Sequence, residues 1–371
     1  MLLSFFIALI SAFVVAFLLV LTDPWHSKFS ADSPGSGPQK LHQRPTPRVG
    51  GIAVMIGFVL ATAATRSQAL IDTGVNSPPW LTAWLVVAIF VPFAAGLIED
   101  VTKSCGARLR LIATFAGAAI AYVFCGAALT RFAVPPLDAL LALHPWVSFA
   151  FTLFCVGAIA NAYNLADGLN GLLAGLAIAA CAALASVASQ YGDPYMVIAP
   201  AALGAATLGF ALFNFPRARL FAGDGGAYMI GTAISLFAIL LCGRHAEVSP
   251  WFAFVLVIYP FVDTTVAIVR RAVNRRPIME PDADHLHTLL AARLTDLFGS
   301  NGRNIASLVI VTTAGVFIFA GTIWHTNTAA LVALCALFVG LYVTVYRRIM
   351  PSKRSTIDLP GSCASASAKS A

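Results

Sequence analysis

Long apolar runs follow one another along most of the chain, separated by short polar segments. A run of about 20 apolar residues can cross the hydrocarbon core of a bilayer as a helix. The pattern therefore predicts an all-α, polytopic integral membrane protein with about eleven transmembrane helices. The predicted helices cover residues 2–21, 50–66, 80–98, 107–127, 146–163, 169–188, 195–213, 226–242, 250–269, 305–324 and 327–346.

Two parts of this prediction have alternatives. The run at 2–21 could be a secretory signal peptide, but it lacks a positive n-region and a small-x-small cleavage site before Asp23, so we expect a retained helix. The helix predicted at 50–66 is short. Three prolines crowd the approach to the fifth helix and could hide a re-entrant turn: Pro135, Pro136 and Pro145.

Lys and Arg are distributed unevenly between the loops. If odd-numbered helices run inward, all of the 23 Lys and Arg except Arg66, Arg131 and Arg244 fall on the cytoplasmic side. This predicts a protein of the bacterial inner membrane with its N-terminus in the periplasm and its C-terminus in the cytoplasm. Residues 1–350 would form one transmembrane catalytic domain, and 351–371, rich in Ser and Ala, a disordered cytoplasmic tail.

Composition narrows the possible partners. Hydrophobic residues make up 59% of the chain and charged residues 11%, which excludes a soluble globular domain. The net charge of +7 is spread over many short loops, so the expected partner is the lipid bilayer and not nucleic acid. Seven scattered cysteines without a C-x-x-C motif predict neither disulfides nor zinc. Apolar helix faces could support a homodimer.

Five polar sequences interrupt the apolar pattern, and the predicted topology places all of them at cytoplasmic helix ends. One charged helix end would mean little, because water and lipid headgroups reach it. Five on the same side indicate a common site. They are QKLHQRPTPRVGG (39–51), GLIEDVTK (96–103), NAYNLADGLNG (161–171), FNFPRARLFAGDGG (213–226) and PDADHLHTLL (281–290).

Acidic and amide side chains supply the candidate chemistry. Glu99 and Asp100 would repel one another unless a divalent metal or a phosphate clamp lies beside them, or unless they form a solvated helix end with basic counter-charges. Neighbours on a helix point about 100° apart, so they need not face one ion. A second segment repeats polar residues every third position, which predicts one polar helix stripe or a capped loop: Asn161, Asn164, Asp167 and Asn170.

Two further segments allow both a chemical and a structural interpretation. Asp224, between glycines before an apolar helix, is either an N-cap or a magnesium ligand shared with substrate phosphates. His285 and His287 share a face only if that loop is extended, and they could donate to phosphate oxygens or be plain surface residues. The segment around PTP reads as an anion clamp or as simple positive-inside sequence, through Lys40, His42 and Arg48.

These motifs resemble the bacterial polyprenyl-phosphate N-acetylaminosugar-1-phosphate transferases of glycosyltransferase family 4, which are related to phospho-N-acetylmuramoyl-pentapeptide transferase. The resemblance covers about residues 39 to 290. It rests on six motifs in family order: KxHxxPTPRxGG, an acidic pair after an apolar helix, NxxNxxDGxxG, FxxGDxG, PxxDTxxxxxRR (260–271) and a histidine-rich loop.

The resemblance implies transfer of a sugar 1-phosphate from a UDP-N-acetylhexosamine, first of all UDP-GlcNAc, to undecaprenyl phosphate. The products would be undecaprenyl-pyrophosphoryl-sugar and UMP, and the step would initiate a cell-envelope polysaccharide such as the O antigen of lipopolysaccharide. Magnesium would be required, with manganese able to replace it. The dianionic lipid phosphate needs little activation, so charge neutralisation and alignment rank above a dedicated base.

Residue roles follow from the same resemblance. Asn164 and Asp224 would bind the metal, Phe221 would stack on uracil, and Asn170 would read its edge. The implied catalytic residues are Glu99, Asp100, Asp167, His285 and His287. The remaining substrate-binding residues would be Lys40, His42, Arg48, Arg108, Arg110 and Asn161.

The chain departs from the family pattern at several positions. Glu99 stands where Asp is usual, Asn170 where Asp is frequent, and the histidine loop has Thr288 in place of a third histidine and Ala283 in place of Arg. Alternatives are phospho-N-acetylmuramoyl-pentapeptide transferase, which carries three consecutive histidines, a catalytically silent scaffold, and a transporter. A transporter should carry its acids in mid-membrane, where Asp263 is the most embedded candidate.

Overall fold

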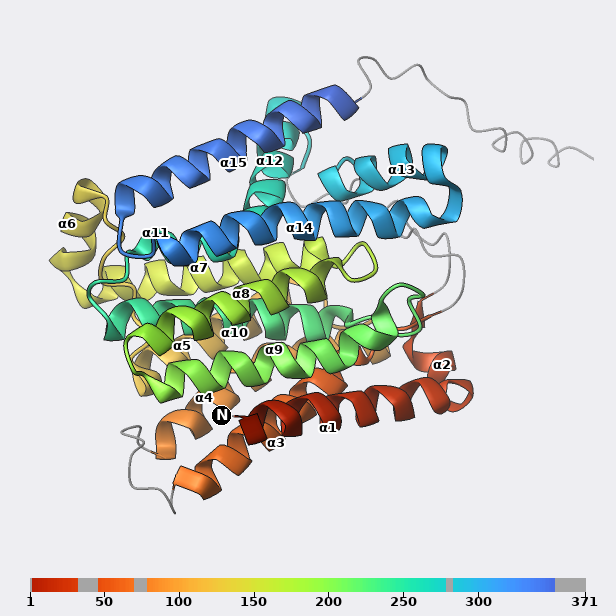
Figure 1. Cartoon of the computed structure of the whole chain (residues 1–371), viewed down its shortest axis with the longest axis horizontal. Coiled ribbons are helices and arrows are strands. Elements are labelled where there is room, and N and C mark those ends of the chain that lie inside the picture. The colour runs from red at the N-terminus through yellow and green to blue at the C-terminus, as the bar shows by residue number, and fades with distance from the viewer. Residues whose placement is uncertain (1, 33–45, 70–78, 278–282, 351–371) are drawn as a thin grey trace, which may run out of the picture.

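The protein is a bundle of α-helices, which confirms the predicted fold class (Figure 1). The computed structural model describes residues 2–32, 46–69, 79–277 and 283–350. The predicted tail at 351–371 lies outside the described residues. In chain order the elements are α1 (Leu2–Leu21), α2 (Asp23–Ser30), β1 (Ala31–Asp32), β2 (Thr46–Pro47), α3 (Gly50–Ala69), α4 (Pro79–Thr102), α5 (Ala107–Cys125), α6 (Pro135–Leu143), α7 (Pro145–Ala166), α8 (Leu172–Gln190), α9 (Pro194–Asn214), α10 (Gly223–Arg244), α11 (Pro250–Leu256), α12 (Ile258–Val273), α13 (Leu286–Phe298), the 3-10 helix η1 (Gly299–Asn301), α14 (Gly302–Ile323) and α15 (Thr328–Ile349).

The membrane-spanning pattern agrees with the sequence. Within the described residues, nine stretches are long and apolar enough to cross a membrane, and the bent pair α11 and α12 adds a tenth. A shorter apolar helix, Gly50–Thr65, lies in α3. Together they correspond one for one to the predicted helices. The only sheet of the described residues is the antiparallel pair β1 and β2, with Ala31 opposite Pro47.

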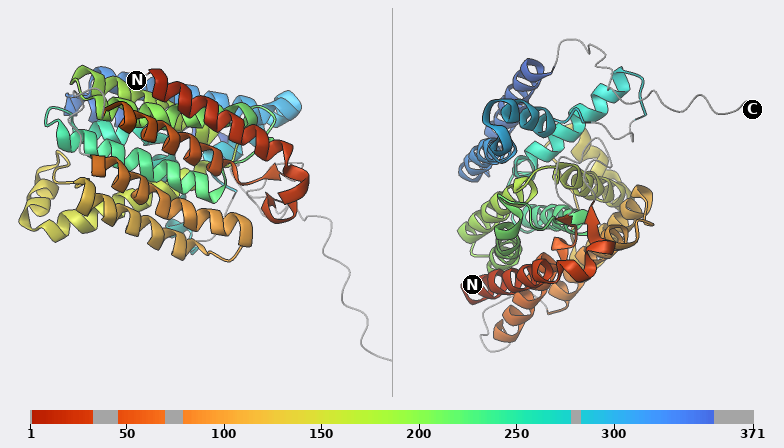
Figure 2. Two further views of the ribbon diagram at one scale, coloured as in Figure 1. Left: turned by 90° about the horizontal axis from the view of Figure 1, so that it is seen from below. Right: turned by 90° about the vertical axis from the view of Figure 1, so that its right-hand side faces the viewer.

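Helix α10 forms the centre of the bundle. Every residue from Gly223 to Cys242 is buried. Helices α3, α4, α5, α7 and α8 all pack against it. The helices are seen almost end-on in the right-hand view of Figure 2. Between apolar helices in lipid, close packing replaces the hydrophobic effect as the source of stability, so small residues are favoured at the contacts. A Cβ atom on Gly96 of α4 would lie 2.5 Å from the backbone nitrogen of Gly225 in α10.

Helix α1 packs by the same principle. Its buried residues recur every fourth position and are all small: Ser4, Ala8, Ala12 and Ala16. Since residues four apart lie on one face of a helix, they form a stripe that contacts α3 and α9. Larger side chains on the other face of α1, such as Leu3, Ile10 and Leu18, are exposed, where lipid would cover them.

One apolar run is broken, at a place other than the prolines near 135 and 145. These prolines begin helices α6 and α7, because proline at the first helical turn has no unsatisfied N–H. The predicted fifth helix is therefore a full span, Pro145–Ala166, and the alternative of a re-entrant turn does not apply to it. The break lies instead between α11 and α12, which meet at an angle of 78°. Pro260 explains it, because its ring cannot follow the carbonyl of Leu256, where α11 ends.

Three helix boundaries differ from the sequence prediction in ways that move candidate residues. Helix α7 ends at Ala166 and α8 begins at Leu172, so Asp167 and Asn170 lie in a turn and the predicted helical stripe stops at Asn164. Helix α10 begins at Gly223, three residues before the predicted start, which places Asp224 inside its first turn.

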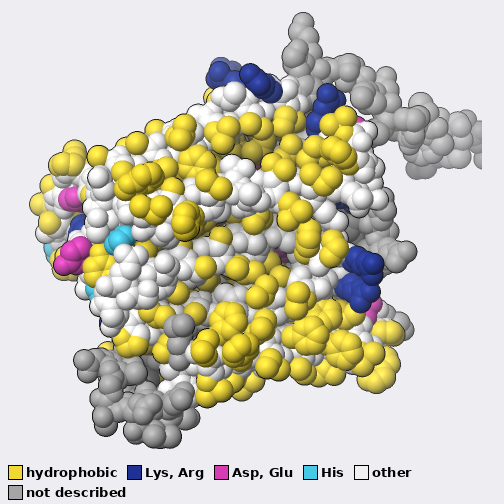
Figure 3. Space-filling view, in the orientation of Figure 1, with side chains coloured by type: hydrophobic (Ala, Val, Ile, Leu, Met, Phe, Trp, Pro, Cys, Tyr) yellow, Lys and Arg dark blue, Asp and Glu magenta, His cyan; other side chains and the backbone are white. Residues whose placement is uncertain are grey.

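The described parts of the five polar sequences lie at the same end of the bundle, on the right of Figure 1. In Figure 3 most of the visible Lys and Arg side chains are at this end or along the top edge, and hydrophobic side chains cover the body. Below, this end is called the motif end.

Polar side chains at the opposite end tie the loops together. Arg131 donates to the carbonyls of Cys242, His245 and Val248. Asp193 accepts from Arg244 at 2.6 Å and contacts His245 at 3.0 Å. Burial would raise the pKa of Asp193, but hydrogen bonds from Arg244, the Met196 amide and His245 outweigh it and hold this pKa below its usual value. These contacts of Arg131 and Asp193 form a structural clasp, which holds the loops at this end together.

The contact between α4 and α10 gives a direct test of the packing. Gly96→Ala should destabilise the protein by about 1–3 kcal/mol, because the new methyl group meets backbone atoms that cannot move aside. Thermal unfolding of the purified protein measures the loss. Gly340→Ala in α15 is the control, since a Cβ there meets nothing within 4 Å. Equal melting temperatures for the two variants would show that this contact is not tight.

Candidate active site

The first turn of α10 is held by a carboxylate from another helix. Asp100, at the end of α4, is 1% exposed. Its Oδ1 accepts from the backbone N–H of Asp224 and its Oδ2 from that of Gly225, both at 2.9 Å. The N-terminal N–H groups of a helix have no partner within the helix and favour negative charge. Asp100 therefore caps α10 from outside.

Gly223 fits in the narrow space between Asp100, which caps α10, and the backbone at Arg48. Its φ of +72° is in the left-handed region, which favours glycine. A Cβ there would lie 2.0 Å from the Arg48 carbonyl oxygen and 2.5 Å from Asp100 Oδ2. The glycine before Asp224 is thus needed for both conformation and space.

Asp224 is not the N-cap that its position suggested. The N-cap residue of α10 is Ala222, and the Asp224 carboxylate is turned toward two arginines. Arg48 Nη2 donates to Asp224 Oδ1 at 2.8 Å, and Arg110 Nη1 contacts Asp224 Oδ2. Arg48 Nε also lies 3.6 Å from Asp100 Oδ1. Two acids and two arginines therefore form one charge cluster.

Glu99 and Asp100 do not act as a pair. Glu99 Oε2 accepts from the backbone N–H of Cys105 at 2.8 Å and so shapes the turn after α4. Asp100 points into the bundle. The divergence follows from their adjacency on a helix.

Two loops distant in sequence are joined by backbone hydrogen bonds beside this cluster. Phe221 N–H donates to the Pro47 carbonyl, and the Phe221 carbonyl accepts from Gly50 N–H at 2.8 Å. Phe221 is half-buried, and its backbone lies beside the start of α3. The PTPR segment and the FAGDGG segment are therefore one structural unit.

The turn between α7 and α8 connects the charge cluster with the histidines. Burial raises the pKa of Asp167 to about 7; the charge of Arg48 lowers it, that of Asp100 raises it, and the Gly223 backbone N–H lowers it. The next residue, Gly168, packs against His287, whose Nε2 would be 2.6 Å from a Cβ at that position. Asp167 thus faces the charge cluster, and Gly168 faces the histidines.

The amide side chains of this segment have different surroundings. Asn161 accepts from the Tyr228 hydroxyl at 3.2 Å, and Arg110 lies over the Tyr228 ring. The Asn164 side chain makes no hydrogen bond with any residue in the described parts of the chain. Asn170 donates to the Pro216 carbonyl and to Asn304 of α14. Its amide group therefore holds the turn in place.

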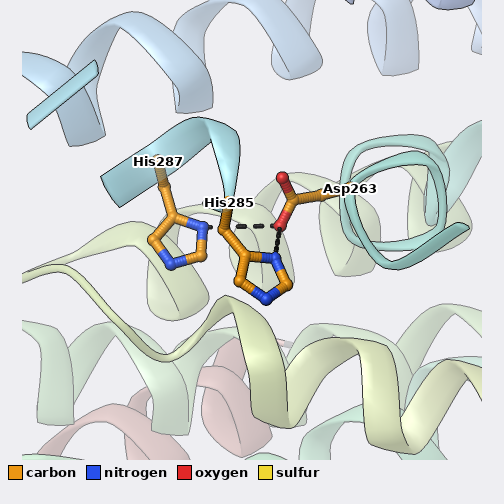
Figure 4. A group of neighbouring side chains, drawn as sticks. All are labelled: Asp263, His285 and His287. Atoms are coloured by element: carbon orange, nitrogen blue, oxygen red, sulfur yellow. Dashed lines mark hydrogen bonds and ion pairs between the residues drawn. The ribbon is translucent and has the colours of Figure 1, made fainter. Parts of the chain in front are cut away.

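The two histidine side chains lie on one side because the backbone changes from extended to helical between them. His285 is extended and precedes α13, whereas His287 lies in the first turn. Their rings are 5.4 Å apart and nearly parallel. Figure 4 shows both with Nδ1 toward the Asp263 carboxylate of α12, at 2.8 Å from His285 and 3.5 Å from His287.

Three sequence candidates are not placed in this cluster. Lys40 and His42 lie outside the described residues. Arg108 is exposed at the start of α5, two residues before Arg110, which faces Asp224.

The donor chemistry of the cluster fits a hard divalent cation. Asn164 offers an unengaged amide oxygen, and Asp167 and Asp224 offer carboxylates, the oxygen ligands that Mg²⁺ prefers. Arg48 and Arg110 now neutralise Asp224. Asp263, His285 and His287 form a second group of possible ligands, whose ligand atoms lie within 4.8 Å of one another.

The chain resembles a family of known proteins. The sequence model of glycosyl transferase family 4 matches residues 82–242. A Bacillus subtilis protein named as a probable undecaprenyl-phosphate N-acetylglucosaminyl 1-phosphate transferase is 30% identical over 93% of this chain and 91% of its own length. The chain belongs to glycosyl transferase family 4.

Other relatives fall into two groups. A decaprenyl-phosphate N-acetylglucosaminephosphotransferase of Mycolicibacterium smegmatis is 32% identical over 82% of this chain and 79% of its own length. A phospho-N-acetylmuramoyl-pentapeptide-transferase of Desulforudis audaxviator is 34% identical, but over 55% of this chain and 65% of its own length. This chain is therefore similar to phosphosugar transferases along most of its length.

Several residues of this family 4 site were not predicted from the sequence. Tyr228, Tyr259 and Tyr342 contact Asn161, His287 and Asp263. Asn214 binds Gly171 N–H and the Leu220 carbonyl, which fixes the two loops to each other. Tyr342 lies in an apolar helix far from every motif, so no local signal marks it. Asn214 ends an apolar helix, and that position was a usable signal.

The raised pKa of Asp167 predicts a pH dependence. Unfolded Asp has a pKa of 3.8 and the folded side chain about 7, so the folded state holds a proton that the unfolded state loses. The stabilisation is present below the unfolded value and is lost as the pH rises through about 7. In metal-free buffer, the melting temperature of the wild type should therefore fall relative to Asp167→Asn between about pH 4 and pH 8. Parallel melting curves for the two proteins would contradict it.

Proposed function

We propose that this protein transfers GlcNAc 1-phosphate from UDP-GlcNAc to undecaprenyl phosphate, giving undecaprenyl-pyrophosphoryl-GlcNAc and UMP. The observation that carries the proposal is the convergence of Asp100, Asp167 and Asp224 with Arg48 and Arg110 at one end of a membrane bundle. The names of the two relatives covered over most of their length, which refer to polyprenyl phosphates and N-acetylglucosamine, support it.

Charge repulsion is the main obstacle to this reaction. A phosphate monoester is largely dianionic at neutral pH and needs little activation, but it must approach a pyrophosphate that is also negative. Arg48 and Arg110 supply fixed positive charge, and each is already oriented by Asp224. The arginines bind and align the phosphates for in-line transfer.

Asn164 and Asp224 are the proposed ligands of Mg²⁺, with Asp167 beside them, and Mn²⁺ would be an acceptable substitute. The ion would supply charge neutralisation at the pyrophosphate oxygens. Asp100 has a different part. Both of its oxygens accept backbone N–H groups of α10, so it positions Asp224 instead of removing a proton from the acceptor.

The base of the donor would lie at the joined loops. Phe221 would stack on uracil beside the start of α3, where its backbone is held by Pro47 and Gly50. Asn170 uses its amide N–H groups within the protein, which leaves the amide oxygen to accept from the uracil ring N–H. His285 and His287 would contact phosphate oxygens.

The motif end would face the cytoplasm, because nearly all Lys and Arg belong to loops on that side. This places the N-terminus in the periplasm and lets a cytoplasmic UDP-sugar reach the site. The product would start a cell-envelope polysaccharide such as an O antigen.

The rival functions differ in observable ways. A transporter would need its charged groups in mid-membrane, but the cluster here is at one end of the bundle. A phospho-N-acetylmuramoyl-pentapeptide transferase would use the UDP-linked pentapeptide and not UDP-GlcNAc. A panel of UDP-N-acetylhexosamines and the UDP-linked pentapeptide, assayed with undecaprenyl phosphate for UMP release, distinguishes these functions.

Substitution of Asp224 tests the site itself. Asp224→Ala should lower transfer in washed membranes on the order of 100-fold or more, because it removes a charge that organises the phosphates. Asp296→Ala is the control, since Asp296 is exposed on α13. Equal protein levels are checked by immunoblot. Full activity of Asp224→Ala would remove the proposed metal site.

A further inference from the structure

Asp263, the acid of the PxxDT motif, is a buried carboxylate to which the proposed function gives no role. It lies on α12, is 2% exposed, and meets donors from two other parts of the chain, the segment 285–287 and α15. Oδ1 accepts from Leu286 N–H at 2.9 Å and from the Tyr342 hydroxyl at 2.6 Å. Oδ2 lies 2.8 Å from His285 Nδ1 and 3.5 Å from His287 Nδ1.

This environment fixes the protonation pattern of the histidines. A buried carboxylate is stable only when donors surround it, and an amide N–H and a hydroxyl already satisfy one oxygen. The other oxygen can accept only if His285 presents Nδ1–H, and His287 gains by doing the same. A hydrogen bond at one ring nitrogen of histidine decides the role of the other.

The second ring nitrogens then face the site. Figure 4 shows the Nε2 atom of each ring on the side away from Asp263. His287 Nε2 lies against Gly168, the residue after Asp167. Thus the tautomer that Asp263 favours leaves Nε2 free of its proton in the neutral ring, and makes Nε2–H a donor in the protonated ring.

We propose that Asp263 is a positioning residue that keeps a proton on Nδ1 of His285 and His287, so that in the protonated rings each Nε2–H donates to the substrate phosphates. The inference rests on the proposed function and deepens it. Asp263 acts through the imidazoles and touches no substrate.

A transition-metal site formed by the same three side chains fits the distances less well. Two ligands of one tetrahedral zinc ion lie about 3.3 Å apart, because each is about 2.0 Å from the metal. His285 Nδ1 and Asp263 Oδ2 are 2.8 Å apart, which is the distance of a hydrogen bond. Oδ1 is also fully used by Leu286 and Tyr342.

The support extends to the last helix, α15. Tyr342 of α15 donates to Asp263, and one helical turn later Tyr346 donates to the Asp284 carbonyl. Arg270 of α12 donates to that same carbonyl and to the Tyr346 oxygen. Helices α12 and α15 therefore fix the segment that carries the histidines from both sides. Tyr259 of α12 also contacts this group, with its hydroxyl 3.4 Å from His287 Nδ1.

The test combines a spectrum with kinetics. Histidine is labelled with ¹⁵N, and solid-state NMR of the protein in bilayers reports which ring nitrogen carries the proton. His285→Gln and His287→Gln assign the signals. Asp263→Asn removes the acceptor, Asp263→Glu keeps the charge on a longer side chain, and Asp296→Asn on α13 is the matched control.

The wild type and the control should show both histidines with a proton on Nδ1. In Asp263→Asn the His285 signal should shift toward the Nε2–H form, and kcat should fall about 10- to 100-fold, as for loss of a group that orients a functional histidine. KM for UDP-GlcNAc should change much less. Asp263→Glu should recover part of kcat and the Nδ1–H signal.

Three results would overturn the inference: an Nε2–H tautomer of His285 in the wild type, an unchanged spectrum in Asp263→Asn, or an unchanged kcat in that variant. The wild-type spectrum decides even if Asp263→Asn does not fold. Wild-type protein that transfers no sugar phosphate would refute the proposed function instead, and the spectra would still show whether Asp263 orients the histidines.

Discussion

The hydrogen-bonded contact between the Asp100 carboxylate and the first turn of α10 is the constraint on which the site depends. It joins the end of α4 to the start of the central helix and fixes where Asp224 points. Without it, the amide groups of α10 would be buried without partners. Gly96, Gly223 and Gly225 are the small residues that bring the two backbones close enough for it to form.

The other site residues at the motif end are arranged around this contact of Asp100 with α10. Arg48 reaches both acids, and the PTPR loop that carries it is held to the loop before α10 by backbone hydrogen bonds. The turn after α7 then adds Asp167 on one side and packs Gly168 against His287 on the other. Charges are concentrated here for chemistry, whereas the clasp at the opposite end uses Arg131 and Asp193 to hold loops.

The sequence was informative where a single rule governs the outcome. Apolar length predicted the helices, and the distribution of Lys and Arg correctly grouped the motifs at one end. The sequence was less informative where the partners of a side chain come from distant segments of the chain. Whether Asp224 caps its own helix depends on Asp100, more than a hundred residues away, and only the fold places Asp100 there. The bend before Pro260 was not predicted, because the prolines that drew a prediction were those that begin α6 and α7.

The histidine loop shows the same limit. The spacing of His285 and His287 left both an extended and a helical arrangement open, and the structure uses one of each. The third member, Asp263, was noted only as the acid of the PxxDT motif and as the most embedded acid, since its role depends on a tyrosine of α15.

The central claim is that this end of the bundle transfers a sugar together with its phosphate. It is tested most directly with UDP-GlcNAc carrying one isotope in the β-phosphate and another in the α-phosphate, incubated with the purified protein and undecaprenyl phosphate. The account predicts the β-label in the lipid product and the α-label in released UMP. Release of UDP carrying both labels, or a lipid product without label, would contradict it.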